Sequence, residues 1–175
     1  MKRKLRPFAI FAIILAVVTV FAHIAGYVIH EISLSPYEYL SENTQGDAET
    51  QIPMELLHEE AHGEDEWIVF FRNQKGSVSC AMLKESFLSY DVLGYAAEIP
   101  LDHTKPYLYA GFRNGEDVDN LVWGLLDDLE VNGVTIDGYP CSIAEVPQYG
   151  IRVYWIWDNH WGENPSKMPE YEEIR

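Results

Sequence analysis

The segment Ile151–Asp158, "IRVYWIWD", decides the fold class, because its residues alternate in the way that a β-strand requires. Successive side chains of a strand point to opposite faces of a sheet. Ile151, Val153, Trp155 and Trp157 therefore fall on one face, and the more mixed residues between them fall on the other. The pattern predicts a strand with one face in the core.

Similar runs continue upstream. Trp67–Arg72, "WIVFFR", is apolar on both faces and predicts a central strand. Asp137 and Gly138 separate two apolar runs, and this dipeptide accepts the positive φ angles of a type I′ hairpin turn. About eight such strands joined by short turns predict a mainly β domain over residues 67–161, either an antiparallel sandwich or an open barrel.

Residues 8–29 form an apolar run whose single ionisable side chain is His23. At about 1.5 Å of rise per residue, a helix of this length crosses a hydrocarbon core of about 30 Å. The flank 1–7 is basic and no acidic residue precedes Glu31, so we expect the N-terminus in the cytoplasm and the rest outside. This is the pattern of a single-pass signal-anchor in the cell membrane. A cleaved signal peptide is the alternative, although its apolar region is usually only about 7–15 residues long.

The remaining chain is strongly acidic. Of the 12 basic residues, four lie in the flank 1–7, so eight face 28 acidic residues from Glu31 onward, a formal charge of −20. Such a field repels nucleic acid and anionic lipid alike. Cationic protein surfaces and divalent metals are the partners that the charge allows.

Residues 30–66 are acidic and turn-rich, which predicts a stalk with one short helix over Pro53–Ala61. This stretch contains "HEEAH", a match to the H-E-x-x-H pattern of zinc peptidases. On a helix, His58 and His62 would face one metal ion, with Glu59 as the base. A third protein ligand is also needed, and the nearest suitably spaced carboxylate, Glu85, lies in a predicted strand. We therefore interpret the motif as a solvated helix end and His58 and His62 as weak metal candidates.

The loop "RNGEDVDN" supplies weaker candidates for calcium, namely Glu116, Asp117 and Asp119. Their spacing does not match an EF-hand loop. We therefore expect no bound metal and no cofactor.

The aromatic segment "YWIWDNHWG" could form a shelf that stacks on sugar rings. The candidate binding residues are Trp157, Asp158, His160 and Trp161. In the alternative interpretation, Trp155 and Trp157 fill the core.

Cys80 and Cys141 both follow the membrane segment, where disulfides persist. Pairing would close a loop of roughly sixty residues and stabilise the fold by about 4 kcal/mol in the chain-entropy model. Two unpaired thiols that act as small hydrophobic side chains are the alternative.

Catalytic motifs are weak. Asp102 beside His103, or Asp158 near His160, could serve acid–base chemistry, but there is no G-x-S-x-G elbow and no glycine-rich phosphate loop. We therefore expect a protein that is not an enzyme, with an envelope hydrolase using His160 or His103 as the alternative.

Two segments, "FFRNQKGSVSCAMLKESFLSYDVLG" and "WGLLDDLEVNGVTIDGYPCSIAEV", resemble small uncharacterised membrane-anchored exported proteins of Gram-positive bacteria. The resemblance covers Trp67–Trp157, and Cys141 stands where alanine is usual in that group. The matching residues are Phe71, Arg72, Gly76, Leu83, Lys84, Gly124, Asp127, Val134, Ile136 and Gly138. These are residues of turns and core, so the resemblance implies location and architecture and no chemistry.

The sequence thus predicts a membrane-tethered extracytoplasmic domain that a stalk holds away from the bilayer, followed by an acidic tail at 162–175. Its expected role is recognition of another envelope component, most plausibly a protein. A carbohydrate-binding module that uses the strand near Trp155–Trp161 is a further alternative.

Overall fold

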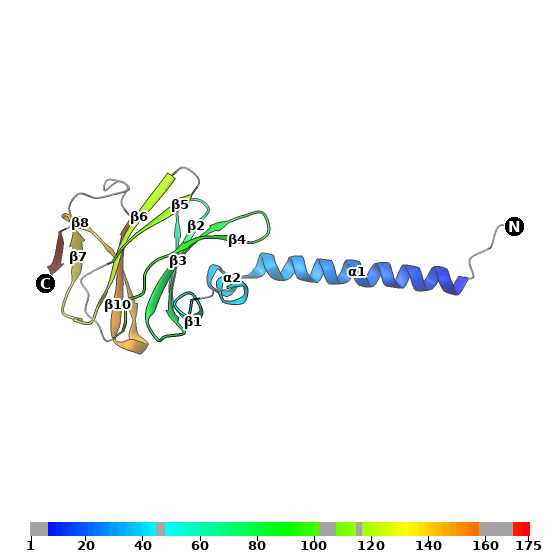
Figure 1. Ribbon diagram of the computed structural model, residues 1–175, viewed down its shortest axis with the longest axis horizontal. Helices are drawn as coiled ribbons and strands as arrows, with labels where there is room; N and C mark the ends of the chain where they lie inside the picture. The colour runs from blue at the N-terminus through cyan, green and yellow to red at the C-terminus, as the bar shows by residue number, and fades with distance from the viewer. Residues whose placement is uncertain (1–6, 45–47, 102–107, 115–116, 158–169) are drawn as a thin grey trace.

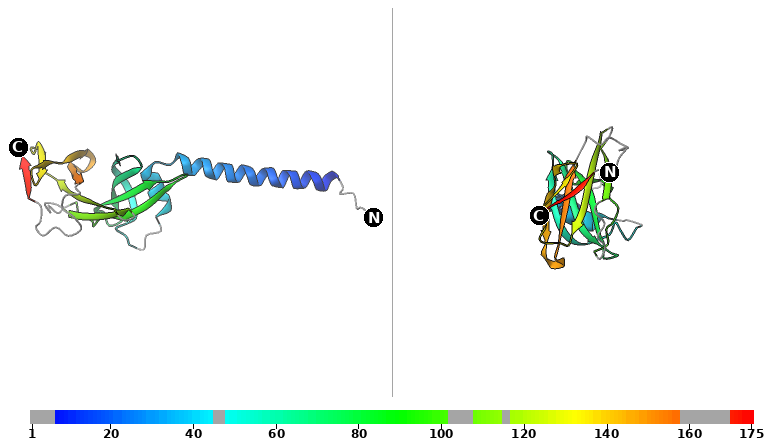
Figure 2. Two further views of the ribbon diagram at one scale, coloured as in Figure 1. Left: turned by 90° about the horizontal axis from the view of Figure 1, so that it is seen from above. Right: turned by 90° about the vertical axis from the view of Figure 1, so that its left-hand side faces the viewer.

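The computed structural model describes residues 7–44, 48–101, 108–114, 117–157 and 170–175. The chain is mainly β, with antiparallel sheets and one N-terminal apolar helix, as the sequence predicts. The long helix α1 (Pro7–Ser33) extends from one end, and strand β11 lies at the opposite end (Figures 1 and 2).

Helix α1 presents its apolar side chains outward. The stretch Phe11–Ser33 is long and apolar enough to cross a membrane, and its most apolar part is not buried in the protein. A second helix, α2 (Pro36–Asn43), begins with a capping box, in which Ser35 and Glu38 satisfy each other's backbone N–H groups.

Three sheets follow in the part of the chain that the structure describes. The strands are β1 (Pro53–His62), β2 (Glu66–Asn73), β3 (Val78–Glu85), β4 (Tyr90–Tyr95), β5 (Leu108–Asn114), β6 (Asp117–Leu126), β7 (Gly133–Ile136), β8 (Tyr139–Pro140), β9 (Ser142–Val146), β10 (Ile151–Trp157) and β11 (Tyr171–Ile174). The first sheet has the order β1-β2-β3-β4, the second β5-β6-β10-β9 and the third β11-β7-β8. Strand β2 is central, which confirms the prediction from its two apolar faces.

The β7–β8 hairpin confirms the predicted turn. Asp137 and Gly138 have φ angles of 51° and 80°. Ile136 pairs with Tyr139 across this two-residue loop, as a type I′ turn requires.

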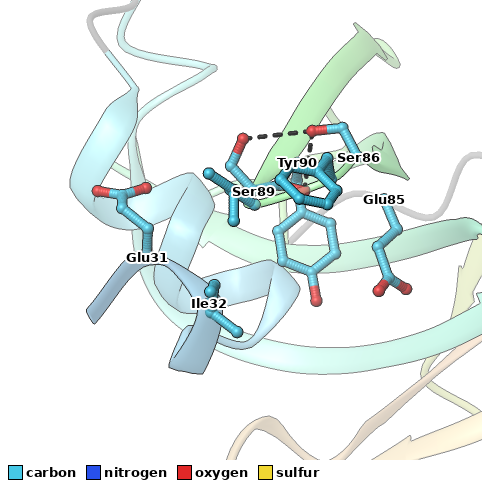
Figure 3. Close-up of a pocket in the computed structure, with 8 residues that line it drawn as sticks. Glu31, Ile32, Glu85, Ser86, Ser89 and Tyr90 are labelled. Carbon is cyan, nitrogen blue, oxygen red and sulfur yellow. Dashed lines mark hydrogen bonds between the residues drawn. The ribbon is translucent and has the colours of Figure 1, made fainter. Parts of the chain in front are cut away.

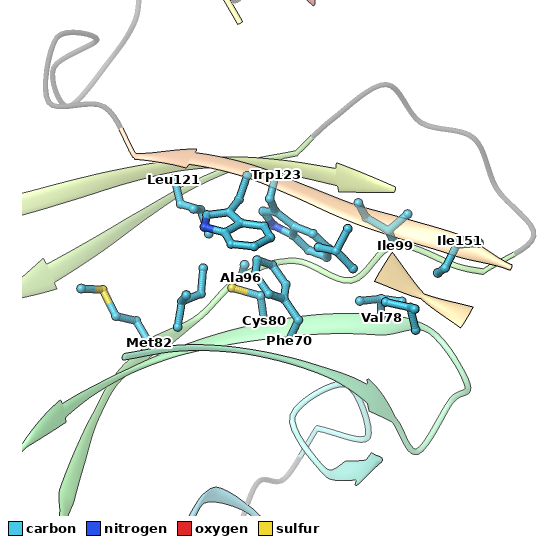
Figure 4. Close-up of a cluster of buried hydrophobic side chains, with 13 residues drawn as sticks. Phe70, Val78, Cys80, Met82, Ala96, Ile99, Leu121, Trp123 and Ile151 are labelled. Atoms are coloured by element: carbon cyan, nitrogen blue, oxygen red, sulfur yellow. The ribbon is translucent and has the colours of Figure 1, made fainter. Parts of the chain in front are cut away.

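The principal core lies between the first and second sheets. Phe70 and Cys80 of the first sheet meet Trp123 and Trp155 of the second, and the ring centroids of Phe70 and Trp123 are 5.5 Å apart (Figure 4). The buried members of this core are Ile68, Phe70, Val78, Cys80, Met82, Ala96, Ile99, Leu121, Trp123, Val146, Ile151, Val153 and Trp155. Alternation along β10 therefore directs Val153 and Trp155 inward, as predicted.

Two further clusters cover the outer faces of these sheets. On the first sheet, Leu40 of α2 packs against Val69 and Phe71. On the second sheet, Tyr154 packs with Val134 of the third sheet. Strands β2 and β10 are therefore buried on both faces over most of their length, and the mixed face of β10 packs against the third sheet through Tyr154.

The predicted helix over Pro53–Ala61 is wrong, because these residues form β1. The local sequence has helical composition, but β1 pairs antiparallel with β2, from His62 opposite Glu66 to Pro53 opposite Asn73. Without β1, the polar backbone edge of the apolar strand β2 would be unpaired. Tertiary pairing overrides local propensity here.

The described part of the predicted stalk is folded onto the domain. The His30 Nε2 at the end of α1 lies 2.9 Å from a Glu42 carboxylate oxygen of α2. The backbone N–H of Tyr37 donates to the Glu59 carboxylate of β1 at 3.1 Å. The sheet accordingly begins at Pro53 rather than at Trp67.

Three smaller expectations are also corrected. Part of the predicted acidic tail at 162–175 is a strand, because β11 pairs with β7. Asp117 and Asp119 lie in β6, paired with Asn114 and Phe112, rather than in a loop. The apolar run from Phe87 also predicts a strand, but β4 begins only at Tyr90, after a turn closed by the Ser86 N–H and the Ser89 carbonyl.

Candidate functional site

The sequence motif HEEAH lies along one side of the molecule where β1 passes over β10. We call this region the β1–β10 seam, and it comprises Glu55, His58, Glu60 and His62 of β1 with Arg72, Tyr149, Trp155 and Trp157.

Strand geometry explains why the histidines meet tryptophans. Residues two apart on a strand share a face, so His58 and His62 point toward the second sheet. The His58 ring centroid lies 5.0 Å from that of Trp155 in a tilted arrangement. The His62 ring stacks on Trp157, with centroids 4.0 Å apart and planes 18° apart.

The same geometry separates the two imidazoles. Four residues of strand advance the chain by about 13 Å, whereas one turn of helix would bring both rings to one side within reach of a single ion. His58 instead lies 3.4 Å from Glu60, through its Nε2 and a carboxylate oxygen. Among the described residues, no three His, Cys, Asp or Glu side chains gather in a way that could hold a metal ion.

The other end of the seam holds a cluster of hydrogen-bonding side chains. The Tyr149 hydroxyl donates to the Glu55 carboxylate, and the Arg72 guanidinium carbon lies 5.8 Å from the centre of the Tyr149 ring. This hydrogen bond to Glu55 raises the pKa of Tyr149, and the nearby Arg72 charge partly opposes the rise. The cluster joins β1 of the first sheet to the turn before β10 of the second.

The contacts of the β1–β10 seam hold the first and second sheets together. Glu55 is engaged by Tyr149, and the two histidines face aromatic rings. Its chemistry is that of packing, cation–π contact and hydrogen bonding.

The proposed aromatic shelf is only partly within the described residues. Trp155 is 2% exposed and belongs to the principal core, as in the alternative interpretation. Trp157 is half-buried and stacks on His62. Asp158, His160 and Trp161 lie outside the described residues, as do Glu116 and His103, so the shelf, the calcium site and the acid–base pairs stay predictions.

The two cysteines are free thiols on opposite sides of the second sheet. Cys80 lies in the principal core between the first and second sheets, and Cys141 packs with the cluster between the second and third sheets. The second sheet stands between them, which explains why the pair does not form the disulfide. Both act as small hydrophobic side chains, the alternative that the sequence left open.

A separate hollow of about 260 Å³ lies beside β9 and β10, and Leu129, Pro147 and Ile151 supply much of its lining. Arg152 also lines it and is 9% exposed. The Arg152 Nη2 donates to the backbone carbonyl of Asp128 at 2.6 Å, which ties the guanidinium to a loop. Its role is structural, because this contact fixes the loop between β6 and β7.

Sequence reasoning missed Glu55 and Tyr149. Their contact joins residues 94 positions apart, so no local pattern could reveal it. The exposed pair Phe87 and Leu88 was also missed, although an apolar pair between two serines is a detectable signal of an unusual turn.

Comparison with protein-family models, with curated proteins and with solved structures finds no match.

Proposed function

We propose that this chain is a membrane-tethered extracytoplasmic interaction domain, related to the small membrane-anchored exported proteins that its sequence resembles. In this proposal α1 is an uncleaved anchor with its N-terminus in the cytoplasm, and the first two sheets form an antiparallel β-sandwich. The ligand is a cationic surface of another envelope protein, and the domain is not an enzyme.

The observation that carries the proposal is the charge of the end opposite α1. The third sheet and its neighbouring loops lie farthest from the helix (Figure 1). We call this end the distal acidic face, and its carboxylates are Asp127, Asp128, Glu130, Asp137, Glu170, Glu172 and Glu173. Within the described residues, Arg175 is the cation that pairs with them, through Asp128 and Glu173.

This arrangement favours a protein partner over a polymer of the envelope. A dense negative field attracts a cationic protein surface and speeds its association, whereas it repels anionic lipids and phosphate polymers. The tether adds a geometric advantage, because α2 and β1 hold the domain next to the helix and direct the distal acidic face away from the bilayer.

The test is cross-linking in intact cells with the full-length protein, followed by recovery of the attached protein. We expect one envelope protein to be recovered, and recovery to fall as salt rises from about 0.1 M to about 1 M. Neutralising Asp127, Glu130 and Glu172 together, as Asn, Gln and Gln, should abolish recovery without changing stability, because all three side chains are exposed.

The matched control neutralises three exposed carboxylates elsewhere, with Glu49→Gln, Glu64→Gln and Asp91→Asn. This variant removes the same formal charge and should keep its partner. Equal loss in both variants would mean that net charge rather than the distal acidic face matters. Turnover of a wall-derived substrate, lost in His160→Ala or His103→Ala, would instead favour the hydrolase.

A further inference from the structure

The β3–β4 hairpin ends in a tight turn with an apolar tip. The Ser86 backbone N–H donates to the Ser89 carbonyl at 2.8 Å, and the Ser86 hydroxyl donates to the same carbonyl at 3.2 Å (Figure 3). Between these serines, Phe87 is 95% exposed and Leu88 is 38% exposed. Polar or small residues usually occupy such turn positions. Exposure of two large apolar side chains to water is unfavourable here.

The tip lies beside the last turns of α1. A hollow of about 140 Å³ is lined by Tyr27, Val28 and Glu31 of the helix together with Leu88 and Ser89 of the tip. A neighbouring hollow of about 60 Å³ extends the contact (Figure 3). Its lining comprises Glu31, Ile32, Glu85, Ser86, Phe87, Leu88, Ser89 and Tyr90. The hairpin and the helix end are therefore at the same height along the helix axis.

This height corresponds to the boundary of a bilayer. A hydrocarbon core of about 30 Å takes about 20 helical residues. Counted from Phe8, where the apolar run begins, such a core ends close to Tyr27. Tyr27 and Val28 then lie at the boundary of the apolar layer, and Leu88 lies beside them.

We propose that the tip Ser86–Ser89 inserts Phe87 and Leu88 into the boundary of the membrane and gives the domain a second contact with the bilayer. This inference rests on the proposed function, since it requires α1 to span the membrane. The tip contacts lipid, because a tip at this height faces acyl chains and headgroups when α1 spans the membrane. Two contacts would also limit rotation of the domain about α1.

The composition of the tip agrees with insertion. Its four residues carry no charge, whereas the domain as a whole is strongly acidic. The nearest lysine on the hairpin, Lys84, pairs with Asp65 at 3.4 Å rather than pointing to a lipid phosphate. Insertion should therefore depend on apolar burial and should occur in neutral lipid.

The test uses the full chain reconstituted into phosphatidylcholine vesicles. A Phe87→Cys variant in a Cys141→Ser background is labelled with a polarity-sensitive fluorophore, while Cys80 is fully buried and does not compete. We expect blue-shifted emission, and quenching by nitroxide-labelled lipid several-fold greater than for a label at Tyr139→Cys. Tyr139 is also exposed but lies in β8, far from α1 (Figure 1).

A label at Val20→Cys separates the two proposals. Strong lipid quenching at both Val20 and Phe87 supports tip insertion. Quenching at Val20 with a water-like signal at Phe87 overturns insertion alone and leaves the tether intact. A water-like signal at Val20 overturns the tether and, with it, the insertion.

A second measurement avoids fluorescence. The measured quantity is the rate at which a water-soluble maleimide labels Phe87→Cys, divided by the rate for Tyr139→Cys. This ratio should be at least several-fold lower in vesicles than in detergent-free denaturant. Equal relative rates in both conditions would overturn insertion.

Discussion

Gly124 of β6 faces the ring of Tyr154 across the pair that β6 forms with β10. A Cβ atom at this position would lie 2.3 Å from the Tyr154 hydroxyl oxygen and 2.4 Å from Cζ, closer than any real contact. Tyr154 is fully buried, so its ring has little room to move. The absence of a side chain at Gly124 is therefore what allows this aromatic residue to pack on the outer face of the second sheet.

Gly124→Ala should consequently lower the free energy of unfolding by about 1–3 kcal/mol, the usual effect of overpacking a core. The matched control is Gly133→Ala in β7, where a Cβ would meet its nearest neighbour, Ile174, at an ordinary 3.5 Å. Urea denaturation of the full chain in detergent micelles, followed by tryptophan emission, measures both variants. Equal effects would contradict the packing described for Tyr154.

The cysteines predict a pH dependence at high pH. Burial raises the pKa of Cys141 to about 12 and raises the pKa of Cys80 as well. An unfolded thiol titrates near pH 8.5, so above that pH the unfolded chain loses a proton that the folded chain retains. Stability is therefore unaffected by these groups below about pH 8.5 and falls as pH rises toward 12.

Cys141→Ala should weaken this fall, because one of the two thiols no longer titrates. Several tyrosines also have raised pKa values, so the wild-type curve and the variant curve should both decline, with the wild type steeper. Denaturation midpoints measured between about pH 8 and pH 11 test this. Parallel curves would show that the Cys141 environment is wetter than its packing implies.

At the scale of elements, β1 shows why the secondary structure of one stretch was predicted wrongly from the sequence while that of others was predicted correctly. Strands β2 and β10 are apolar enough to be recognised alone, and the Asp137–Gly138 turn has a local conformational cause. Strand β1 has helical composition and becomes a strand only by pairing with β2. A partner that lies outside the local window decides its structure, so periodicity could not predict it.

The contacts of the β1–β10 seam also depend on partners that are distant in the sequence. Once β1 is known to be a strand, the sequence shows that His58 and His62 lie on the same face of it. Their partners Trp155 and Trp157 lie nearly a hundred residues away, and only the packing of two sheets brings them together. Local sequence thus specifies which side chains share a face, and the fold specifies what that face meets.

His62→Ala should destabilise the full chain by about 0.5–1.5 kcal/mol, because it removes the stacked contact with Trp157. Glu64→Ala is a suitable control, since it is an exposed residue two positions away in the turn that follows β1. Chemical denaturation in micelles gives the free energies, and added zinc should change neither. A zinc-dependent gain in stability that His62→Ala abolishes would restore the peptidase-like interpretation of HEEAH.

At the scale of the whole molecule, the exposed apolar surface and the densest negative charge lie in different places. Helix α1 extends from one end of the molecule, and β11 of the third sheet lies at the other (Figure 2). The apolar tip Phe87–Leu88 adjoins the last turns of α1, whereas the distal acidic face belongs to the third sheet and its loops. If α1 spans the membrane as proposed, the Lys and Arg residues of its N-terminal flank favour the orientation in which the domain is exported.

Protease added to intact cells should therefore remove the domain, while a tag placed before Met1 should stay protected until the cells are lysed. Mass spectrometry of the membrane-bound remnant should find the original N-terminus. A protected domain, or a mature N-terminus near Gly26, would contradict the retained anchor and its orientation.

The folding of residues 53–62 into the first sheet makes a second prediction about the whole molecule. A flexible acidic stalk would be cut readily by a glutamate-specific protease, whereas a paired strand must first open. We expect the bonds after Glu55, Glu59 and Glu60 to resist cleavage in the native full chain and to be cut at once in denaturant. Fragments that begin at Leu56 or Ala61 and appear before the rest of the domain is degraded would show that β1 is detached. Their absence would mean that β1 stays paired with β2 in the native chain, so that the sheet begins at Pro53 and residues 53–62 are not a flexible stalk.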